Sequence, residues 1–276
     1  MLSIAALILI VTSNVVLGQD DRHPDVGQIY PLDMAPDSVD DMYKGCTEKM
    51  EKLVKTTFLK QEICNNTAQF GAAWINNTGQ FPESKKLKMH HLIAISVYTG
   101  DEIPIYKEFN PSVRSGIQKY QNRTYKWYSL QFLLTEAIKI LKETKPGCMI
   151  TYRGTNHIYN EDVLNTEIRF GSFASSSINK SVAMEFGTQS CFKIKTCYGA
   201  NVTKYSDYPG ETEVLIPPYE KFRVIKIKKR GQKGAWCNTV FKLESSGTQS
   251  NLNCKIASVK PNKYHNMVNI KYLNYL

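Results

Sequence analysis

Two glutamates separated by a single residue, Glu211 and Glu213, stand just before an apolar run at residues 214–216. Side chains alternate across a β-strand, so residues two apart project from the same face, about 6.5 Å apart along the backbone. The spacing therefore predicts two carboxylates in one cleft. Such a pair can act on a sugar carbon that develops positive charge, because one carboxylate stabilises the cation while the other handles a proton.

The pair alone is weak evidence, because a Glu-x-Glu is expected by chance about once in a chain of this length. The alternative interpretation is a solvated strand edge. A second candidate is Arg153, which ends an apolar strand and is followed by Gly154, where the backbone can approach a ligand closely. Arginine binds phosphate through two parallel hydrogen bonds, although a buried arginine at a strand end is more often a salt-bridge partner.

A third candidate is a serine cluster at 175–177, which follows Phe173 and precedes a short predicted helix through Ala183 and Phe186. The hydroxyls can cap that helix. Alternatively, Ser175 can orient a catalytic carboxylate by donating a hydrogen bond to it. No serine has the Gly-x-Ser-x-Gly setting of a nucleophile elbow, so the sequence gives no support to acyl transfer.

The elements that must position these residues change character near residue 146. Residues 38–145 show helical spacing of apolar residues, with a first helix opening at Asp40 and Asp41 and reaching Phe58 or beyond, and others at 85–98 and 125–143. Helices first and strands later predict an α+β fold, and no glycine-rich turn supports a Rossmann site. The predicted strands are 149–153, 167–170, 192–197, 211–216, 222–229, 239–244 and 253–259.

The chain carries a net charge of +10, and its 42% hydrophobic residues are ordinary for a folded protein. This charge suits an anionic substrate, nucleic acid or acidic glycans. The densest basic run, residues 226–230, alternates with apolar residues and predicts a half-exposed strand that ends in a basic turn. A solvated edge is favoured there, and no nucleic-acid partner is expected. The five histidines lack metal-ligand spacing, so no metal site is expected.

Residues 1–18 contain a short apolar run, a polar break and a small residue at the end, which is typical of a cleaved secretory signal. The run is too short to span a bilayer comfortably, so a membrane anchor is the weaker alternative. Seven cysteines suggest disulfides, and their odd number leaves at least one thiol free or available to another molecule. Five glycosylation sequons fit the same secreted, extracellular location: Asn65, Asn76, Asn122, Asn179 and Asn201.

Four segments of the β-rich half resemble the arginine, serine and Glu-x-Glu motifs of the arginine-specific mono-ADP-ribosyltransferases, in the order of that family. The similarity extends to residues 106–110, 132–135 and 250–254 and so covers nearly all of the mature chain. The four segments are Tyr152-Arg153-Gly154-Thr155, Arg169-Phe170-Gly171, Phe173-Ala174-Ser175-Ser176-Ser177 and Glu211-Thr212-Glu213-Val214-Leu215-Ile216-Pro217-Pro218-Tyr219-Glu220.

The resemblance implies transfer of ADP-ribose from NAD to arginine side chains of acceptor proteins, with release of nicotinamide. NAD is then a co-substrate, and no cofactor is bound permanently. Arg153, with Gly154, would hold an NAD phosphate, and Ser175 would orient Glu213 on the nicotinamide ribose. Glu211 would position the acceptor guanidinium and ease its deprotonation. Related enzymes with Gln at the first position of the pair tend to hydrolyse NAD, so Glu211 favours transfer.

The family's acceptor-recognition loop corresponds to residues 198–209, where Tyr208 is a candidate aromatic contact for an arginine. Ser206 matches a family serine near the nucleotide. Ser172 stands where the family commonly has Gln, which puts an NAD contact from that position in doubt. This departure supports one alternative, a secreted basic glycoprotein that keeps the fold without catalysis. The nearer alternative is an NAD glycohydrolase, in which water replaces arginine.

The resemblance also implies a domain plan and two disulfides. One ADP-ribosyltransferase domain would span 19–276, mainly helical at 38–146, with a mixed sheet or β-sandwich forming the NAD-binding core at 147–260. The tail at 261–276 is polar and interrupted, which favours a secreted product without a lipid anchor. The implied pairs are Cys46 with Cys254 and Cys148 with Cys197, leaving Cys64, Cys191 and Cys237 for a third bridge and one free thiol.

Overall fold

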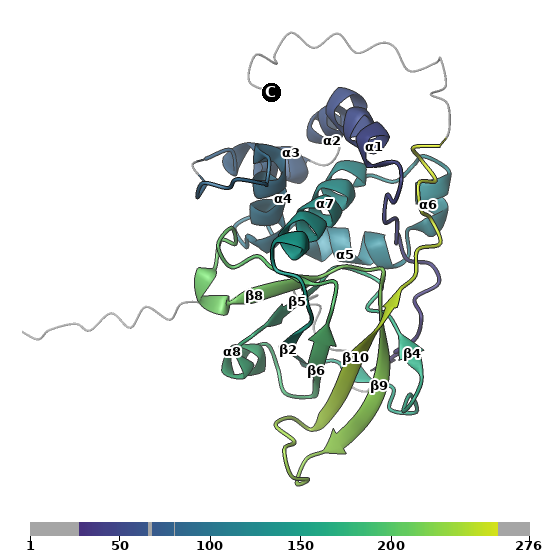
Figure 1. The fold of residues 1–276 in the computed structure, drawn as a ribbon, viewed down its shortest axis with the longest axis vertical. Helices are drawn as coiled ribbons and strands as arrows, with labels where there is room; N and C mark the ends of the chain where they lie inside the picture. The colour runs from purple at the N-terminus through teal and green to yellow at the C-terminus, as the bar shows by residue number, and fades with distance from the viewer. Residues whose placement is uncertain (1–27, 66–67, 80, 259–276) are drawn as a thin grey trace, which may run out of the picture.

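The computed structural model describes residues 28–65, 68–79 and 81–258. Helices occupy the first part of the chain and lie above the sheet in Figure 1, which confirms the α+β prediction. They are α1 (Thr47–Leu53), a π-helix (Val54–Phe58), α2 (Leu59–Asn65), α3 (Ala68–Asn76), α4 (Met89–Thr99), α5 (Tyr106–Arg114), α6 (Ile117–Gln121) and α7 (Tyr128–Thr144).

The strands follow, with one short helix, α8 (Lys180–Glu185), among them. They form an eight-stranded sheet of order β4-β9-β10-β6-β2-β5-β8-β7 and a separate parallel pair, β1 and β3. The pairs are antiparallel except β6 with β10 and β1 with β3. The strands are β1 (Ile29–Tyr30), β2 (Met149–Thr155), β3 (Ile158–Tyr159), β4 (Glu167–Ile168), β5 (Ala174–Ser177), β6 (Ser190–Thr196), β7 (Ala200–Asn201), β8 (Glu213–Ile216), β9 (Glu220–Lys229) and β10 (Thr239–Thr248).

The core between the helices and the sheet is built around α7. The apolar side of this helix, predicted at 125–143, packs in the core with Leu130 and Leu134 fully covered, and sheet residues Phe173 and Leu215 join the same cluster. A second cluster lies within the sheet layer and includes Phe192, Phe222 and Phe241. Burial on this scale supplies most of the stabilising free energy and fixes β5 and β8 against the helices.

The predicted start of the first helix at Asp40 and Asp41 is wrong, because α1 begins at Thr47. Neither aspartate caps a helix. Asp40 is fully buried, forms an ion pair with Arg169 at 2.6 Å and accepts hydrogen bonds from the backbone of Asn251 and Leu252. A buried charge needs such partners, and here they come from segments that are distant in the sequence. The pattern of residues within one segment therefore gave no sign of them.

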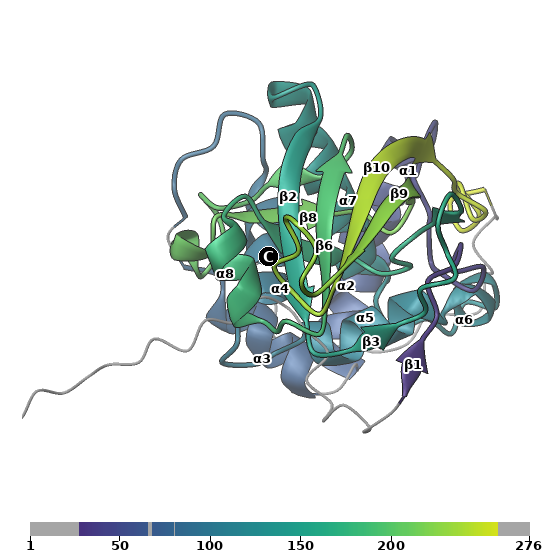
Figure 2. The same ribbon diagram turned by 90° about the horizontal axis from the view of Figure 1, so that it is seen from below.

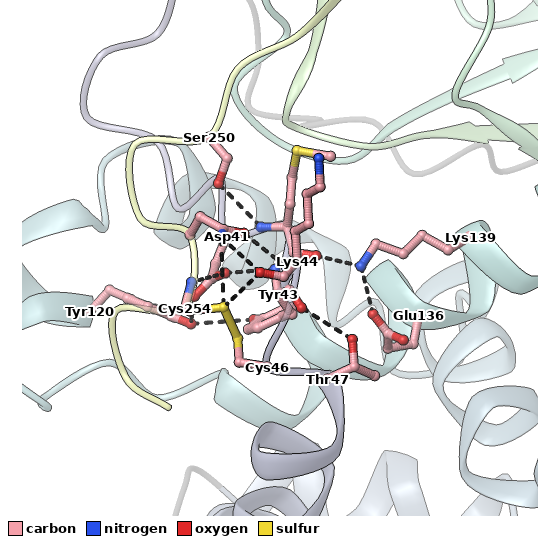
Figure 3. A network of polar contacts seen from close by, with 12 residues as sticks. Asp41, Tyr43, Lys44, Cys46, Thr47, Tyr120, Glu136, Lys139, Ser250 and Cys254 are labelled. Atoms are coloured by element: carbon pink, nitrogen blue, oxygen red, sulfur yellow. Dashed lines mark hydrogen bonds and ion pairs between the residues drawn. A yellow bond between two sulfur atoms is a disulfide. The ribbon is translucent and has the colours of Figure 1, made fainter. Parts of the chain in front are cut away.

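Asp41 makes a second connection between the two ends of the described chain, as Figure 3 shows. Its carboxylate accepts hydrogen bonds from the backbone of Tyr43 at 2.8 Å and Cys254 at 2.9 Å, and from the Tyr120 hydroxyl at 2.8 Å. Burial raises the pKa of Asp41 to about 6 despite these donors.

The strand predicted at 253–259 is wrong, because residues 253–258 form turns, with Cys254 at a φ of 61°.

The described residues form three disulfides, and two of them are the pairs that the resemblance implies. Cys46–Cys254 joins positions 208 apart, and Cys148–Cys197 ties the start of β2 to the end of β6. The third is Cys191–Cys237, and Cys64 is a free, exposed thiol. Several disulfides in one chain are typical of an oxidising, extracellular compartment.

The predicted signal at 1–18 and tail at 261–276 lie outside the described residues. Among those that are described, no helix has the length and apolarity to cross a membrane.

Candidate active site

Arg153, Ser175 and Glu213 lie on three neighbouring strands, β2, β5 and β8. Ser177 pairs with Glu213, and Ser175 pairs with Leu215 across the β5–β8 ladder. Because residues directly opposite one another, and residues two apart, share a face of a sheet, Ser175 and Glu213 project from the same face. That face meets the helical layer, since Leu215 belongs to the core cluster around α7. The predicted capping role of the serines is wrong, because they form β5 and Asn179 caps α8.

Glu213 is 2% exposed, and burial raises the pKa of its carboxyl group to about 7. The hydroxyls of Ser175 and Ser206 and the Arg153 guanidinium oppose that rise by favouring the charged form. Ser206 Oγ lies 3.4 Å from Glu213 Oε2, a long hydrogen bond. Ser175 is close enough to lower the pKa, but its geometry falls short of a hydrogen bond.

Two buried polar atoms at this point therefore lack a hydrogen-bond partner within the described chain: Ser175 Oγ and Glu213 Oε1. An unsatisfied buried donor or acceptor costs roughly 1–3 kcal/mol, so native proteins rarely keep one without a reason. A hydroxyl-bearing substrate that reaches these atoms would satisfy both.

Arg153 is half-buried, and its Nη1 donates a hydrogen bond of 2.7 Å to the carbonyl oxygen of Ser175. Burial lowers the pKa of the guanidinium, which nevertheless stays charged. Among the described residues no carboxylate forms an ion pair with Arg153. The salt-bridge role that the sequence left open for it belongs instead to Arg169, whose pair with Asp40 is fully buried.

Gly154 has a packing reason for lacking a side chain. A Cβ atom there would come within 2.2 Å of the Ala183 carbonyl oxygen and 2.4 Å of the Gly187 carbonyl oxygen. Both contacts are with backbone, which cannot move aside, so only glycine lets β2 pack against α8. Packing therefore explains the glycine at this position, and the approach of a ligand to Gly154 stays a prediction.

The strand predicted to begin at Glu211 begins at Glu213 instead. Residues Pro209–Glu211 form a short 3₁₀ helix, and Thr212 adopts a left-handed conformation with a φ of 48°. Strand alternation therefore does not apply between the two glutamates, although both are buried, with Glu211 3% exposed. The Ser177 hydroxyl donates a hydrogen bond of 2.6 Å to the Glu211 carbonyl oxygen and fixes this turn against β5.

The predicted acceptor loop at 198–209 reaches the site through Ser206. The Ser206 hydroxyl donates a hydrogen bond to Glu213 and does not face an open surface. Ser206 Oγ also accepts a hydrogen bond of 3.1 Å from the Tyr208 backbone. The Tyr208 ring is half-buried, and its hydroxyl donates to Asp101, just beyond the end of α4. Tyr208 therefore stands at a fixed position in the loop that leads into Glu211.

A cleft of about 320 Å³ opens beside Arg153, between β3 and α5, which Figure 2 shows next to each other. It contains a second guanidinium, that of Arg114, whose Nη2 donates to Ser172 Oγ at 3.2 Å. The sequence did not single out Arg114, because a charged residue on an amphipathic helix is normally solvated. Several aromatic and polar residues complete the lining: Tyr30, Asn110, His157, Tyr159, Phe170 and Phe173.

Comparison with known proteins identifies the architecture. A sequence model described as "NAD:arginine ADP-ribosyltransferase" matches residues 32–250. The chain belongs to this family. A relative named "NAD(P)(+)--arginine ADP-ribosyltransferase 2" from Gallus gallus is 34% identical over 84% of this chain and 75% of its own length. The GPI-linked NAD(P)(+)--arginine ADP-ribosyltransferase 1 from Mus musculus is 34% identical over 83% of this chain and 74% of its own.

Solved structures agree. A variant of the eukaryotic mono-ADP-ribosyltransferase ART2.2 in complex with NAD superposes with a TM-score of 0.65 and 31% identity, over 81% of this chain and 98% of that one. These matches confirm the predicted family and the ADP-ribosyltransferase fold. They also confirm the predicted activity, which is that of an NAD-dependent arginine mono-ADP-ribosyltransferase. The roles of individual residues stay predictions.

In this ADP-ribosyltransferase, sequence reasoning missed Tyr98 on α4. Its hydroxyl donates to the Phe173 carbonyl oxygen and accepts from Asn110 Nδ2, both at 3.1 Å. Burial raises its pKa to about 12, and Glu213, Ser175 and Arg153 all influence that value, which places Tyr98 beside the candidate catalytic groups. Helical spacing predicted only that Tyr98 is buried. Burial alone does not distinguish a core tyrosine from one beside a carboxylate.

Proposed function

We propose that Glu213 is the residue on which transfer of ADP-ribose from NAD to acceptor arginines depends in this enzyme. The observation that carries the proposal is the buried Glu213 carboxylate, with an unsatisfied oxygen, beside Ser175, Ser206 and Arg153. A carboxylate in this position accepts a hydrogen bond from a ribose hydroxyl and stabilises positive charge on the anomeric carbon. Ser175 holds the orientation of that carboxylate when substrate is bound.

The donor side of the reaction uses the cleft. Arg153 and Arg114 both line it, and two guanidinium groups suit the two negative charges of a pyrophosphate. The aromatic lining offers flat faces to the nicotinamide and adenine rings. The C–N bond to nicotinamide breaks with its electron pair going to the ring, so nicotinamide leaves uncharged and the sugar carbon becomes cationic.

The acceptor side uses Glu211 and Tyr208. A guanidinium is protonated at neutral pH and is not nucleophilic until it loses a proton. We propose that Glu211 holds the acceptor arginine, takes that proton as the new C–N bond forms, and so directs the sugar cation to arginine rather than water. Tyr208, which Asp101 holds in place, contacts the acceptor side chain with its ring. Loss of these acceptor contacts would leave an NAD glycohydrolase.

The test of the proposal is an incubation of the disulfide-intact protein with NAD labelled in its ADP-ribose part. The acceptors are an arginine-rich protein and a version with every arginine replaced by lysine. We expect stable label on the arginine protein alone, and none on it with Glu213→Ala. An unlabelled arginine protein, or label on both proteins, would refute the proposal, and activity that survives in Glu213→Ala would favour a different catalytic group.

Arg114→Ala should raise KM for NAD about tenfold and change kcat less than about threefold. Arg114 is exposed and lines the cleft, where we assign it to the pyrophosphate rather than to the sugar. It should therefore contribute uniform binding through a charge-assisted contact of about 1.4 kcal/mol. Steady-state kinetics at low and high salt measure this, and the effect should shrink as salt screens the charge. Lys119→Ala, which removes an exposed charge outside the cleft, is the matched control. A fall in kcat with unchanged KM would place Arg114 in the transition state instead.

We further propose that the enzyme is secreted. Three disulfides among the described residues and the sequons support an extracellular location. The expectation of no membrane anchor stays a prediction, since one matched relative is GPI-linked. Expression in animal cells tests the proposal: we expect the protein in the medium, whereas retention on the cell surface would contradict it.

A further inference from the structure

Three lysines stand directly opposite one another on three neighbouring strands of the large sheet. Lys193 on β6 pairs with Lys242 on β10, and Lys242 pairs with Lys226 on β9. Tyr152 on β2 pairs with Lys193 and extends the row to a fourth strand. Neighbouring strands are about 4.8 Å apart, so the three lysines, here called the lysine row, span about 10 Å, and Tyr152 lies about 5 Å beyond one end.

The lysine row lies on the outer face of the sheet. The residues that alternate with it, Phe192, Phe241 and Leu243, point to the other face and are buried in the second core cluster. Lys226 is exposed, and Lys193 and Lys242 are partly exposed. In Figure 1 these strands lie at the end of the molecule opposite α1 and α2, and none of the three lysines lines the cleft beside Arg153.

Like charges in directly opposed positions destabilise a sheet, so their presence calls for a reason. Within the described chain neither Lys193 nor Lys226 forms an ion pair with a carboxylate. Only Lys242 does, with Glu244 at 3.2 Å. Further cations on the neighbouring positions of the same strands increase the positive potential: Lys195, Arg223 and Lys228. Glu244 also stands directly opposite Lys195 and Arg223 and offsets part of this charge. Cations still outnumber that carboxylate on these strands, so the face that carries the lysine row is net cationic.

An aromatic pair closes one end of the lysine row. Tyr152 meets Trp236 edge to face, with ring centroids 6.0 Å apart, and both side chains are half-buried. Trp236 is held next to the Cys191–Cys237 disulfide, which fixes the β9–β10 connection to β6. A sugar ring can pack on such an aromatic surface while anionic groups farther along its chain meet the lysines.

We propose that the lysine row, with Tyr152 and Trp236, binds a sulfated glycan chain. Sulfate groups on a linear sugar polymer match a straight row of ammonium groups, and the disulfides place the protein where such glycans occur rather than with nucleic acid. The site is separate from the ADP-ribosylation site and does not depend on the residue roles proposed there. It would concentrate the enzyme at glycan-coated cell surfaces.

The experiment measures salt-dependent binding of the full secreted chain to immobilised heparin, used as the probe. The test variant is Lys193→Gln/Lys226→Gln/Lys242→Gln, and the matched control is Lys49→Gln/Lys52→Gln/Lys145→Gln, which removes the same charge from exposed helix and loop positions. We expect the control to elute near the wild type and the test variant at clearly lower salt. Because the test variant lacks three ion contacts, the slope of log K against log salt should become less steep by about 2–3.

NAD turnover, the melting temperature and a Trp236→Ala variant provide further measurements. The test variant should keep NAD turnover and should melt no lower than the wild type, because it removes repulsion between opposed charges. Trp236→Ala should weaken heparin binding without changing the salt slope. Equal elution of the test and control variants would overturn the proposal, because the net charge alone would then explain binding. Tighter binding to duplex DNA or to phosphatidylserine vesicles than to heparin at equal salt would reassign the surface to that partner and overturn it as well.

Discussion

Glu213→Gln is expected to lower both ADP-ribosyl transfer and NAD hydrolysis by about 10²–10³-fold while making the folded protein more stable above pH 7. The two effects have one cause, a carboxylate that is buried in the fold and whose charge we propose the reaction uses. Removing one group that stabilises developing charge typically costs about 10²–10³ in kcat. Glutamine has nearly the same shape but no charge to offer the cationic sugar, so both reactions should fall together.

The gain in stability follows from the pKa of Glu213, which rises from 4.5 to about 7 on folding because of burial. Below pH 4.5 the group is protonated in both states and has no charge to bury. Between pH 4.5 and 7 the unfolded chain releases the proton and the folded chain keeps it, so stability falls as pH rises. Above pH 7 the full penalty is present, about 3 kcal/mol.

Chemical denaturation of wild type and variant at pH 5 and pH 8 measures this difference. We expect little change at pH 5 and a gain of about 2 kcal/mol for Glu213→Gln at pH 8, after about 1 kcal/mol is lost from the weakened contact with Ser206. Glu244→Gln, which changes a carboxylate that is 41% exposed, should alter neither stability nor activity. A variant of Glu213 that loses activity without gaining stability would show that its carboxylate is not buried as the structure has it.

The pH dependence of the wild type provides an independent measurement. The ionised carboxylate is the form that stabilises a cation, so kcat/KM for NAD should rise with pH through about 7. A profile that is flat from pH 5.5 to 8 would mean that Glu213 ionises at its ordinary pKa.

What the sequence predicted well has a local physical signal. The stripe of α7 and the alternation of β6, β9 and β10 depend on periodic burial, and the structure has these elements close to the predicted bounds. Asp40 and Asp41 were assigned to a helix start because acidic residues are common there. Asp40 instead pairs with Arg169 and the backbone of Leu252, and Asp41 accepts a hydrogen bond from Cys254. These three partners lie more than a hundred positions away, and no local pattern encodes those contacts.

The candidate site shows the same division. Arg153, Ser175 and Glu213 were found because their motifs are distinctive, and the structure brings them together on adjacent strands. Arg114 was not found, because its sequence neighbours say only that it is a surface residue of a helix. The left-handed Thr212 was also missed, since threonine rarely adopts that conformation. It separates Glu211 from β8 and gives the two glutamates different surroundings, which supports the different roles that we propose for them.

Glu211→Gln should separate the two activities that Glu213→Gln lowers together. We expect transfer to arginine to fall about 10²-fold, the usual contribution of a general base, while NAD hydrolysis without acceptor stays within about threefold of the wild type. Glutamine can occupy the same buried turn, which the Ser177 hydroxyl holds through the backbone rather than the side chain. The donor cleft and Glu213 should therefore keep their geometry.

The measurement uses one reaction mixture with labelled NAD and a fixed concentration of arginine acceptor, in which modified acceptor and free ADP-ribose are counted together. Tyr208→Phe is the companion variant: it keeps the ring in the acceptor loop and removes only the hydroxyl that bonds Asp101. We expect it to lower transfer much less than Glu211→Gln does. A parallel fall of transfer and hydrolysis in Glu211→Gln would mean that Glu211 serves the donor sugar as well.

The ratio of the two products is the sharper quantity. Water and guanidine compete for the same cationic sugar after nicotinamide has left, so any defect in NAD binding, in bond cleavage or in the active fraction of the enzyme affects both products equally. The ratio changes only when a group acts on one of the two competitors, arginine or water, more than on the other. If Glu211 removes the guanidinium proton, the ratio of transfer to hydrolysis should fall by the same factor as transfer itself. It should also partly recover at high pH, where more of the acceptor arginine has already lost its proton.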